Sequence, residues 1–354
     1  MPIDCHTVRA GRARMRFAAT ILTAIALAIL GLLAATSAAS AADSAVILMY
    51  QRIGEPGRAD NISAADFDAH LAELANPRYH VMRLEDLIAA FTSGTALPDR
   101  TVVITFDDAY RSVYDIAVPK LAARGFPYTV FVSTDAVDER RDGMMSWGQI
   151  QVVAEKGADI GNHGARPLHM VEMSAEANRE NISRAAARIA EEVGTPPTVF
   201  AYPYGEFANA ARKLVAMMGY AGAVGQFSGV AAADQPVYAL PRFVFTDAYA
   251  GIDRFRTIVN ALPFPVADVL PDNPKLTANP PSLGFTLTSK IAGAEAMACV
   301  PSFGGNADVE HLGDRVEVRF DKPFPKGNGR VTCTATTSDN RVRWLGVPVY
   351  VPKN

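Results

Sequence analysis

Two adjacent carboxylates end a run of apolar and β-branched residues in the stretch "TVVITFDDAY", residues 101–110. Like charges this close together repel, so Asp107 and Asp108 call for a compensating cation, and a divalent metal is the simplest one. One carboxylate would bind the metal while the other stayed free to take a proton from water. The pair therefore predicts metal-assisted hydrolysis, although two aspartates after a strand also serve as a helix cap or turn.

A histidine stands in a comparable place. His163 ends "ADIGNH", another short apolar segment. A neutral imidazole together with a carboxylate suits a zinc-like ion that keeps open positions. Taken alone, a histidine at such a place is equally compatible with a structural role. Together with Asp108, it is the second candidate metal ligand.

The elements that must position these residues alternate along the chain. Apolar strand patterns alternate with helical patterns, one of which begins at Ser63 as its N-cap and another at Ser146. This order predicts parallel strands with helices packed outside them, and it gathers the residues that follow each strand on one rim. The expected strands are 45–50, 99–106, 127–133, 158–163 and 198–205, and the expected helices are 63–74, 109–125, 146–157 and 174–194.

Three segments in this order resemble the motifs of a known family. "TFDDAY", "DIGNHGARPLHM" and "FAYPYGEF" are similar to the three motifs of the polysaccharide deacetylases, which form carbohydrate esterase family four. The similarity extends over about 45–247. It implies a distorted (β/α) barrel, a divalent metal cofactor and an acetylated polysaccharide or oligosaccharide as substrate.

The resemblance also implies roles for single residues. Asp107 would be the general base, Asp108 and His163 would bind the metal, and the backbone N–H of Tyr204 would stabilise the oxyanion. Zinc is the expected ion, with cobalt, nickel, manganese or iron as alternatives. The neighbours of Tyr204 in the third motif, which would contact substrate, are Pro203 and Gly205.

The chain departs from the family pattern at two positions. The second histidine ligand usually follows the first at the fourth position, where this chain has Pro167. His169, two residues further on, is the nearest imidazole and is equally a candidate third ligand or an ordinary loop residue. Relatives acting on poly-N-acetylglucosamine have a histidine, a candidate acid, where this chain has Gln51, and an amide gives up no proton at neutral pH. The general acid therefore stays unassigned.

Two further residues are candidates for the site. Arg242, in "LPRF", either forms an ion pair that orients Asp107 or faces solvent, and we favour the ion pair. Trp147, at the start of an expected helix, either anchors the core or offers its ring to a sugar. Both are therefore included among the expected substrate-binding residues.

The first 42 residues differ from the rest. Four arginines precede an uncharged run, 17–35, and small residues follow it, which indicates a signal peptide removed after Ala41 or Ala42. The run is also long enough to remain as a membrane anchor. Loss of four arginines and one aspartate would change the net charge from −3 to −6. A chain this acidic is not expected to present a basic surface to nucleic acid. We therefore expect export to the periplasm or cell envelope.

The pattern changes again near the C-terminus. Proline and asparagine crowd 265–281, which we interpret as a linker, and short alternating strands over 282–354 predict a small β-sandwich. Cys299 and Cys333 are the cysteines left in the mature chain, and a disulfide between them is the simplest reading, with two buried thiols as the alternative. Trp344 is expected in the core of this sandwich.

Composition and motifs together favour an exported, metal-dependent hydrolase with its deacetylase domain at 43–264. With 49% hydrophobic residues the chain can form a sizeable core. Removal of N-acetyl groups is favoured and removal of O-acetyl groups is an alternative, because an alkoxide needs less protonation than an amide nitrogen. The competing hypothesis is a carbohydrate-binding or scaffold protein that has lost catalysis, as Gln51 and Pro167 would suggest.

Overall fold

The computed structural model describes residues 41–353. Most of the expected signal peptide therefore lies outside the described residues, and its last two residues, Ala41–Ala42, form strand β1 antiparallel to β6, Leu97–Pro98. Within residues 41–353 no helix is both long and apolar enough to cross a membrane.

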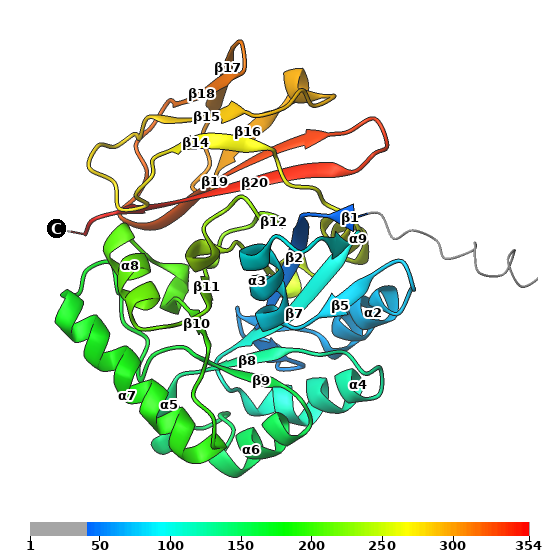
Figure 1. The fold of residues 1–354 in the computed structure, drawn as a ribbon, viewed down its shortest axis with the longest axis vertical. Coiled ribbons are helices and arrows are strands. Elements are labelled where there is room, and N and C mark those ends of the chain that lie inside the picture. The colour runs from blue at the N-terminus through cyan, green and yellow to red at the C-terminus, as the bar shows by residue number, and fades with distance from the viewer. Residues whose placement is uncertain (1–40, 354) are drawn as a thin grey trace, which may run out of the picture. The chain divides into compact units, whose positions relative to one another are not determined.

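A curled parallel sheet forms the first domain (Figure 1). Its strands run in the order β11-β10-β9-β8-β7-β2-β12, with β13 beside β2 and β5 beside β7, and only β12 is antiparallel to its neighbour. This is the distorted (β/α) barrel that the alternating pattern predicted. The strands are β2 Ser44–Tyr50, β5 His80–Met82, β7 Thr101–Asp107, β8 Thr129–Val132, β9 Asp159–Asn162, β10 Val199–Ala201, β11 Gly222–Val224, β12 Ala231–Ala232 and β13 Phe243–Val244.

Helices follow the strands and pack against the sheet, and their starts obey the expected capping chemistry. Ser63 and Ser174 each accept a hydrogen bond from a backbone N–H of the first turn, and Ser146 forms a complete capping box with Gln149. Pro119 lies in the first turn of α4, directly after a π-helical turn, Val113–Ala117. The helices are α2 Ala64–Leu74, α3 Leu84–Ser93, α4 Val118–Ala122, α5 Thr134–Asp138, α6 Trp147–Glu155, α7 Ala175–Val193, α8 Asn209–Met217 and α9 Ile252–Val259.

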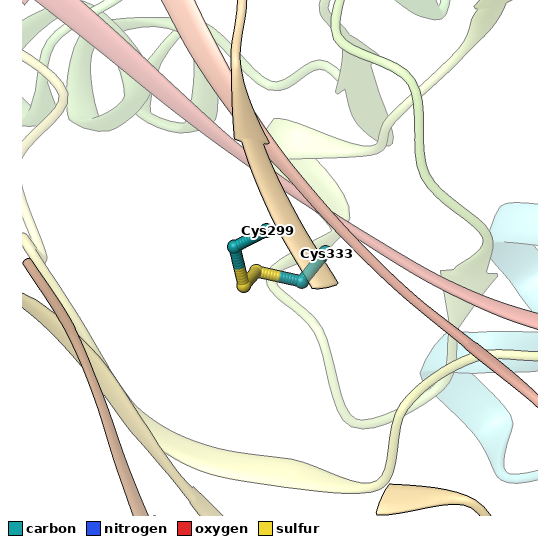
Figure 2. The surroundings of a disulfide bond; sticks show 2 residues. All are labelled: Cys299 and Cys333. Atoms are coloured by element: carbon teal, nitrogen blue, oxygen red, sulfur yellow. A yellow bond between two sulfur atoms is a disulfide. The ribbon is translucent and has the colours of Figure 1, made fainter. Parts of the chain in front are cut away.

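Two antiparallel sheets form the C-terminal part. One has the order β14-β15-β18-β17 and the other β16-β19-β20, and apolar side chains from both fill the space between them. A disulfide joins Cys299 on β16 to Cys333 on β19, which are directly paired residues (Figure 2). The strands are β14 Val266–Leu270, β15 Leu283–Leu287, β16 Ala298–Pro301, β17 Ala307–Leu312, β18 Arg315–Phe320, β19 Gly327–Thr336 and β20 Val342–Val351.

Two expectations for this region need correction. The segment 265–281 is more than a linker, because it contains β14, which pairs with β15 and forms an edge of the sandwich. Trp344 packs against the core of the barrel domain, not that of the sandwich, and meets Phe243 edge to face at 5.0 Å between ring centroids. Trp344 therefore lies where strand β20 of the sandwich packs against the barrel.

Candidate active site

Neighbouring strands deliver the expected residues to one edge of the sheet. Because β7, β8, β9 and β10 are adjacent and parallel, the segments that follow them lie side by side. Asp107 ends β7, Ser133 follows β8, His163 follows β9, and the turn around Tyr204 follows β10. The predicted convergence of the motifs is thus a consequence of strand order.

Asp107 is the compensated member of the aspartate pair. It is fully buried, and Arg242, also fully buried, donates from Nη1 to Oδ1 at 2.6 Å and from Nη2 to Oδ2 at 2.7 Å. Gln226 Nε2 donates to Oδ2 at 3.2 Å. Burial alone would raise the pKa of Asp107, but the charges of Arg242 and His163 and these hydrogen bonds outweigh it and keep that pKa low. The ion pair with Arg242 that the sequence favoured is therefore present.

Asp108 has a different environment. Its φ is +58°, in the left-handed region, so the alternation of side chains along the strand is broken between Asp107 and Asp108. One hydrogen bond reaches its carboxylate, from Ser133 Oγ at 3.3 Å. Burial raises the pKa of Asp108, the negative charge of Asp107 adds to the rise, and His163 opposes it. Asp108 is thus a partly buried carboxylate without a full cation partner among the described residues.

His163 is prepared to act as a ligand. It is 3% exposed, and its Nδ1 lies 2.8 Å from the carbonyl oxygen of Ala201. A carbonyl only accepts hydrogen bonds, so Nδ1 is the donor, and Nε2 is the ring nitrogen that a metal would take. Asp108 and His163 therefore fit two positions of a divalent ion. Within residues 41–353 no group of three or more histidine, cysteine, aspartate or glutamate residues forms a complete metal site.

His169, the candidate third ligand, has another partner in the structure. Its Nδ1 donates to Glu206 Oε2 at 2.7 Å, and Glu206 is 5% exposed. The imidazole also stacks on the ring of Tyr204, with centroids 4.6 Å apart. The structure brings His169 to the third motif and does not group it with Asp108 and His163. Glu206 was present in the quoted motif, but nothing in the sequence indicated this contact.

The third motif forms a tight turn where we expected the strand to continue. β10 ends at Ala201, and Pro203–Gly205 form a 3-10 turn in which Tyr204 has φ +59° and Gly205 has φ +68°. A Cβ on Gly205 would lie 2.4 Å from the backbone nitrogen of Gln226, so no side chain fits there. Burial raises the pKa of Tyr204, and the negative charges of Asp108 and Glu206 add to the rise.

The remaining candidates are less connected to the site. Trp147 packs partly against the core, donates from Nε1 to Asp138 at 2.7 Å and carries the Arg188 guanidinium over its ring at 5.2 Å. His70 is fully buried between Tyr50 and the carbonyl of Ala250. The described contacts of Trp147 are thus with protein groups, and His70, a further histidine of the barrel, is a core residue.

Comparisons with known proteins agree with this geometry. Residues 94–223 match the family model described as polysaccharide deacetylase. The Bacillus subtilis protein YxkH, whose name assigns it to the polysaccharide deacetylases, is 24% identical over 205 residues, which cover 58% of this chain and 72% of that protein.

Solved structures share the fold. The deacetylase PplD of Streptococcus pyogenes, solved in complex with acetate, aligns with a TM-score of 0.57 and 18% identity over 61% of this chain and 98% of its own. IcaB from Ammonifex degensii aligns with a TM-score of 0.55 and 24% identity over 62% of this chain and 98% of its own. The motifs, the fold and the match over residues 94–223 together show a polysaccharide deacetylase domain in this chain, which makes it a hydrolase of that type.

Proposed function

We propose that the protein is an exported, metal-dependent hydrolase that removes acetyl groups from a polysaccharide or its oligomers, with N-acetyl groups as the favoured substrate. The observation that supports this most directly is the contrast between two adjacent carboxylates. Asp107 is ionised and fixed by Arg242, whereas Asp108 is partly buried and has no full cation partner among the described residues. A pair of this kind can bind a cation through one member and accept a proton through the other.

Asp108 and His163 would hold the divalent ion. Zinc is the expected ion because a carboxylate oxygen and an imidazole nitrogen are ligands that it commonly takes. When bound, such an ion supplies a Lewis acid that acidifies water and polarises an acetyl carbonyl. The hydrogen bond from His163 Nδ1 to Ala201 orients the ring, and a partner of this kind commonly changes metal affinity by roughly 10-fold to 100-fold.

Asp107 would take the proton from the attacking water. Oδ1 accepts one hydrogen bond, from Arg242 Nη1, and a carboxylate oxygen has room for a second partner. The bidentate contact with Arg242 holds the carboxylate plane in one orientation. The low pKa of Asp107 keeps it in the ionised form that a base requires.

The Tyr204 N–H would stabilise the negative charge that develops on the acetyl oxygen. Loss of one such donor commonly lowers kcat by roughly a hundredfold or more. No residue of the described chain is placed as the acid for the leaving group, because Gln51 is an amide and His70 is a core residue. An ester substrate needs this acid least, so O-acetyl groups are the second substrate to test.

Acetate release tests the proposal. The purified chain, with added zinc, cobalt or nickel, is incubated with oligomers of N-acetylglucosamine and with an O-acetylated xylan. We expect release that chelation abolishes and that Asp107→Asn lowers by roughly 10²-fold or more. Asp253→Asn is the matched control, because the side chain of Asp253 is 96% exposed on α9.

The competing function is carbohydrate binding without catalysis. It is favoured by Pro167 at the position of the second histidine ligand and by the absence of a complete three-residue metal group in residues 41–353. Retention on an immobilised glycan, with no acetate released from either substrate under any added metal, would support binding over hydrolysis.

A further inference from the structure

The C-terminal sandwich contacts the turn that carries the third motif. Asn328, on β19, donates a hydrogen bond from Nδ2 to the carbonyl oxygen of Tyr204 at 2.9 Å. Asn328 is otherwise exposed, and its neighbours across the strand pair lie on β20. A side chain from a separate domain therefore binds the backbone of a residue proposed to act in catalysis.

The same end of the sandwich also contacts the loop that follows the second motif. Tyr350, which pairs with Asn328 across β19 and β20, donates from Oη to Glu172 Oε1 at 2.6 Å. Lys275 Nζ donates to the carbonyl of Val171 at 3.1 Å. In Figure 1, β19 and β20 are the sandwich strands that lie next to the barrel domain. The sandwich thus contacts the turn of the third motif and the loop that follows the second motif.

The turn itself has a conformation that benefits from such support. Tyr204 and Gly205 are two consecutive left-handed residues, and a tyrosine adopts φ +59° only where its surroundings impose it. Gln226 packs against Gly205 on one side. The Tyr204 side chain is held twice, because its ring stacks on His169 and its Oη donates to the carbonyl oxygen of Pro167. The Tyr204 carbonyl accepts the hydrogen bond from Asn328. Asn328 is the contributor from outside the barrel domain.

We infer that Asn328 is a positioning residue for deacetylation, which holds the Tyr204–Gly205 peptide and thereby keeps the turn in the conformation that presents the Tyr204 N–H to the acetyl oxygen. The Tyr204 carbonyl and the Gly205 N–H share one peptide plane, and this N–H donates to the carbonyl oxygen of Tyr202 at 2.8 Å. The Tyr204 N–H belongs to the preceding peptide plane, which meets the held plane at the Tyr204 Cα. Rotation of the held plane would therefore alter the backbone angles of Tyr204 and, through the turn, the direction of its N–H. The inference depends on the proposed function, because it concerns the residue proposed to stabilise the oxyanion. It assigns the sandwich a part in the reaction, whereas the family match ends at residue 223.

Two measurements test the inference. The first is steady-state acetate release from N-acetylglucosamine oligomers by the full chain and by Asn328→Ala, with Asn306→Ala as the matched control, an exposed asparagine of the sandwich. We expect kcat to fall about tenfold in Asn328→Ala, with KM changed less than about twofold, because positioning errors affect the transition state more than substrate binding. Asn328→Gln, which keeps the amide donor, should recover part of kcat.

The second measurement does not depend on activity. Hydrogen–deuterium exchange of the peptide spanning 202–207 should be faster in Asn328→Ala than in the wild type and unchanged in Asn306→Ala, while the melting temperature stays the same. Wild-type exchange and wild-type kcat in Asn328→Ala would overturn the inference. If the wild-type chain releases no acetate from any substrate, the proposed function fails, and the exchange result still decides whether Asn328 holds the turn.

Discussion

The barrel edge and the sandwich core differ in the kind of side chain that they bury. Within residues 41–353, every buried polar or charged residue lies at or before Arg242, and the sandwich core consists of apolar side chains and one disulfide. Burial of a polar group costs free energy unless the group is paired, so the barrel must compensate Asp107 with Arg242 and leaves Asp108, which is partly buried, without a full partner among the described residues. The comparison indicates that the barrel edge is built for chemistry and the sandwich for stability and support.

Removal of Arg242 should cause the largest loss of stability, and this loss should arise in the barrel. Arg242→Met leaves the carboxylate of Asp107 buried without its counter-ion, which should lower the free energy of unfolding by about 3–5 kcal/mol. Urea denaturation measures the loss. The double variant Asp107→Leu with Arg242→Met should recover most of it, because no buried charge is then left alone. A single variant as stable as the wild type would contradict the buried ion pair.

Removal of the disulfide should cause a loss of stability that arises in the sandwich. Replacement of both Cys299 and Cys333 by serine frees a loop with a sequence separation of 34, which should cost about 3–4 kcal/mol on the chain-entropy model. Thermal and urea unfolding in the absence of reductant give the value. The wild-type chain with reductant should show the same loss. A double variant with the same free energy of unfolding as the wild type would mean that apolar packing alone holds the two sheets together.

His70 makes stability depend on pH. Burial lowers the pKa of His70 to about 4, from 6.5 in the unfolded chain, so the unfolded state binds the proton more readily. Stability is therefore complete above pH 6.5 and is lost as the pH falls toward 4, by about 3 kcal/mol from this residue. Urea unfolding between pH 7.5 and 4.5 should show that the free energy of unfolding changes less with pH in His70→Gln than in the wild type. His80→Gln, at an exposed position, should keep the wild-type slope.

Asp108 should give the smallest change, with the opposite sign. Without metal, Asp108→Asn removes a partly buried charge that lacks a full partner, so it should stabilise the chain by about 1 kcal/mol. Asp107→Asn removes the partner of Arg242 and should destabilise it. Melting in the presence of chelator compares the two variants. Destabilisation by both would show that Asp108 is compensated as fully as its neighbour.

The fold was largely predictable because it depends on local patterns. The alternating apolar segments, the serine caps and the positions of Asp107 and His163 after their strands all follow from neighbours in sequence. The short strand β14 was missed because prolines flank it and its partner, β15, lies further along the chain. Trp344 was assigned to the wrong core because its position in β20 does not reveal which domain it faces.

The site was predictable only in part, for the same reason. Its aspartates and His163 stand in recognisable motifs, but the contacts that set their chemistry join distant segments. Gln226 reaches Asp107 across 119 positions, and Asn328 reaches Tyr204 across 124. No motif surrounds either residue. Likewise, the left-handed turn at Tyr204 depends on packing against Gln226, whereas the local pattern favoured a longer strand.

Zinc binding tests the central claim most directly, namely that Asp108 and His163 hold the cation while Asp107 stays free of it. Isothermal titration of zinc into the chelator-treated chain should show about one site per molecule. Asp108→Asn should weaken this binding by roughly 10-fold to 100-fold or more, whereas Asp107→Asn and the surface control Asp253→Asn should bind zinc nearly as the wild type does. Wild-type zinc affinity in Asp108→Asn, or its loss in Asp107→Asn alone, would contradict the account.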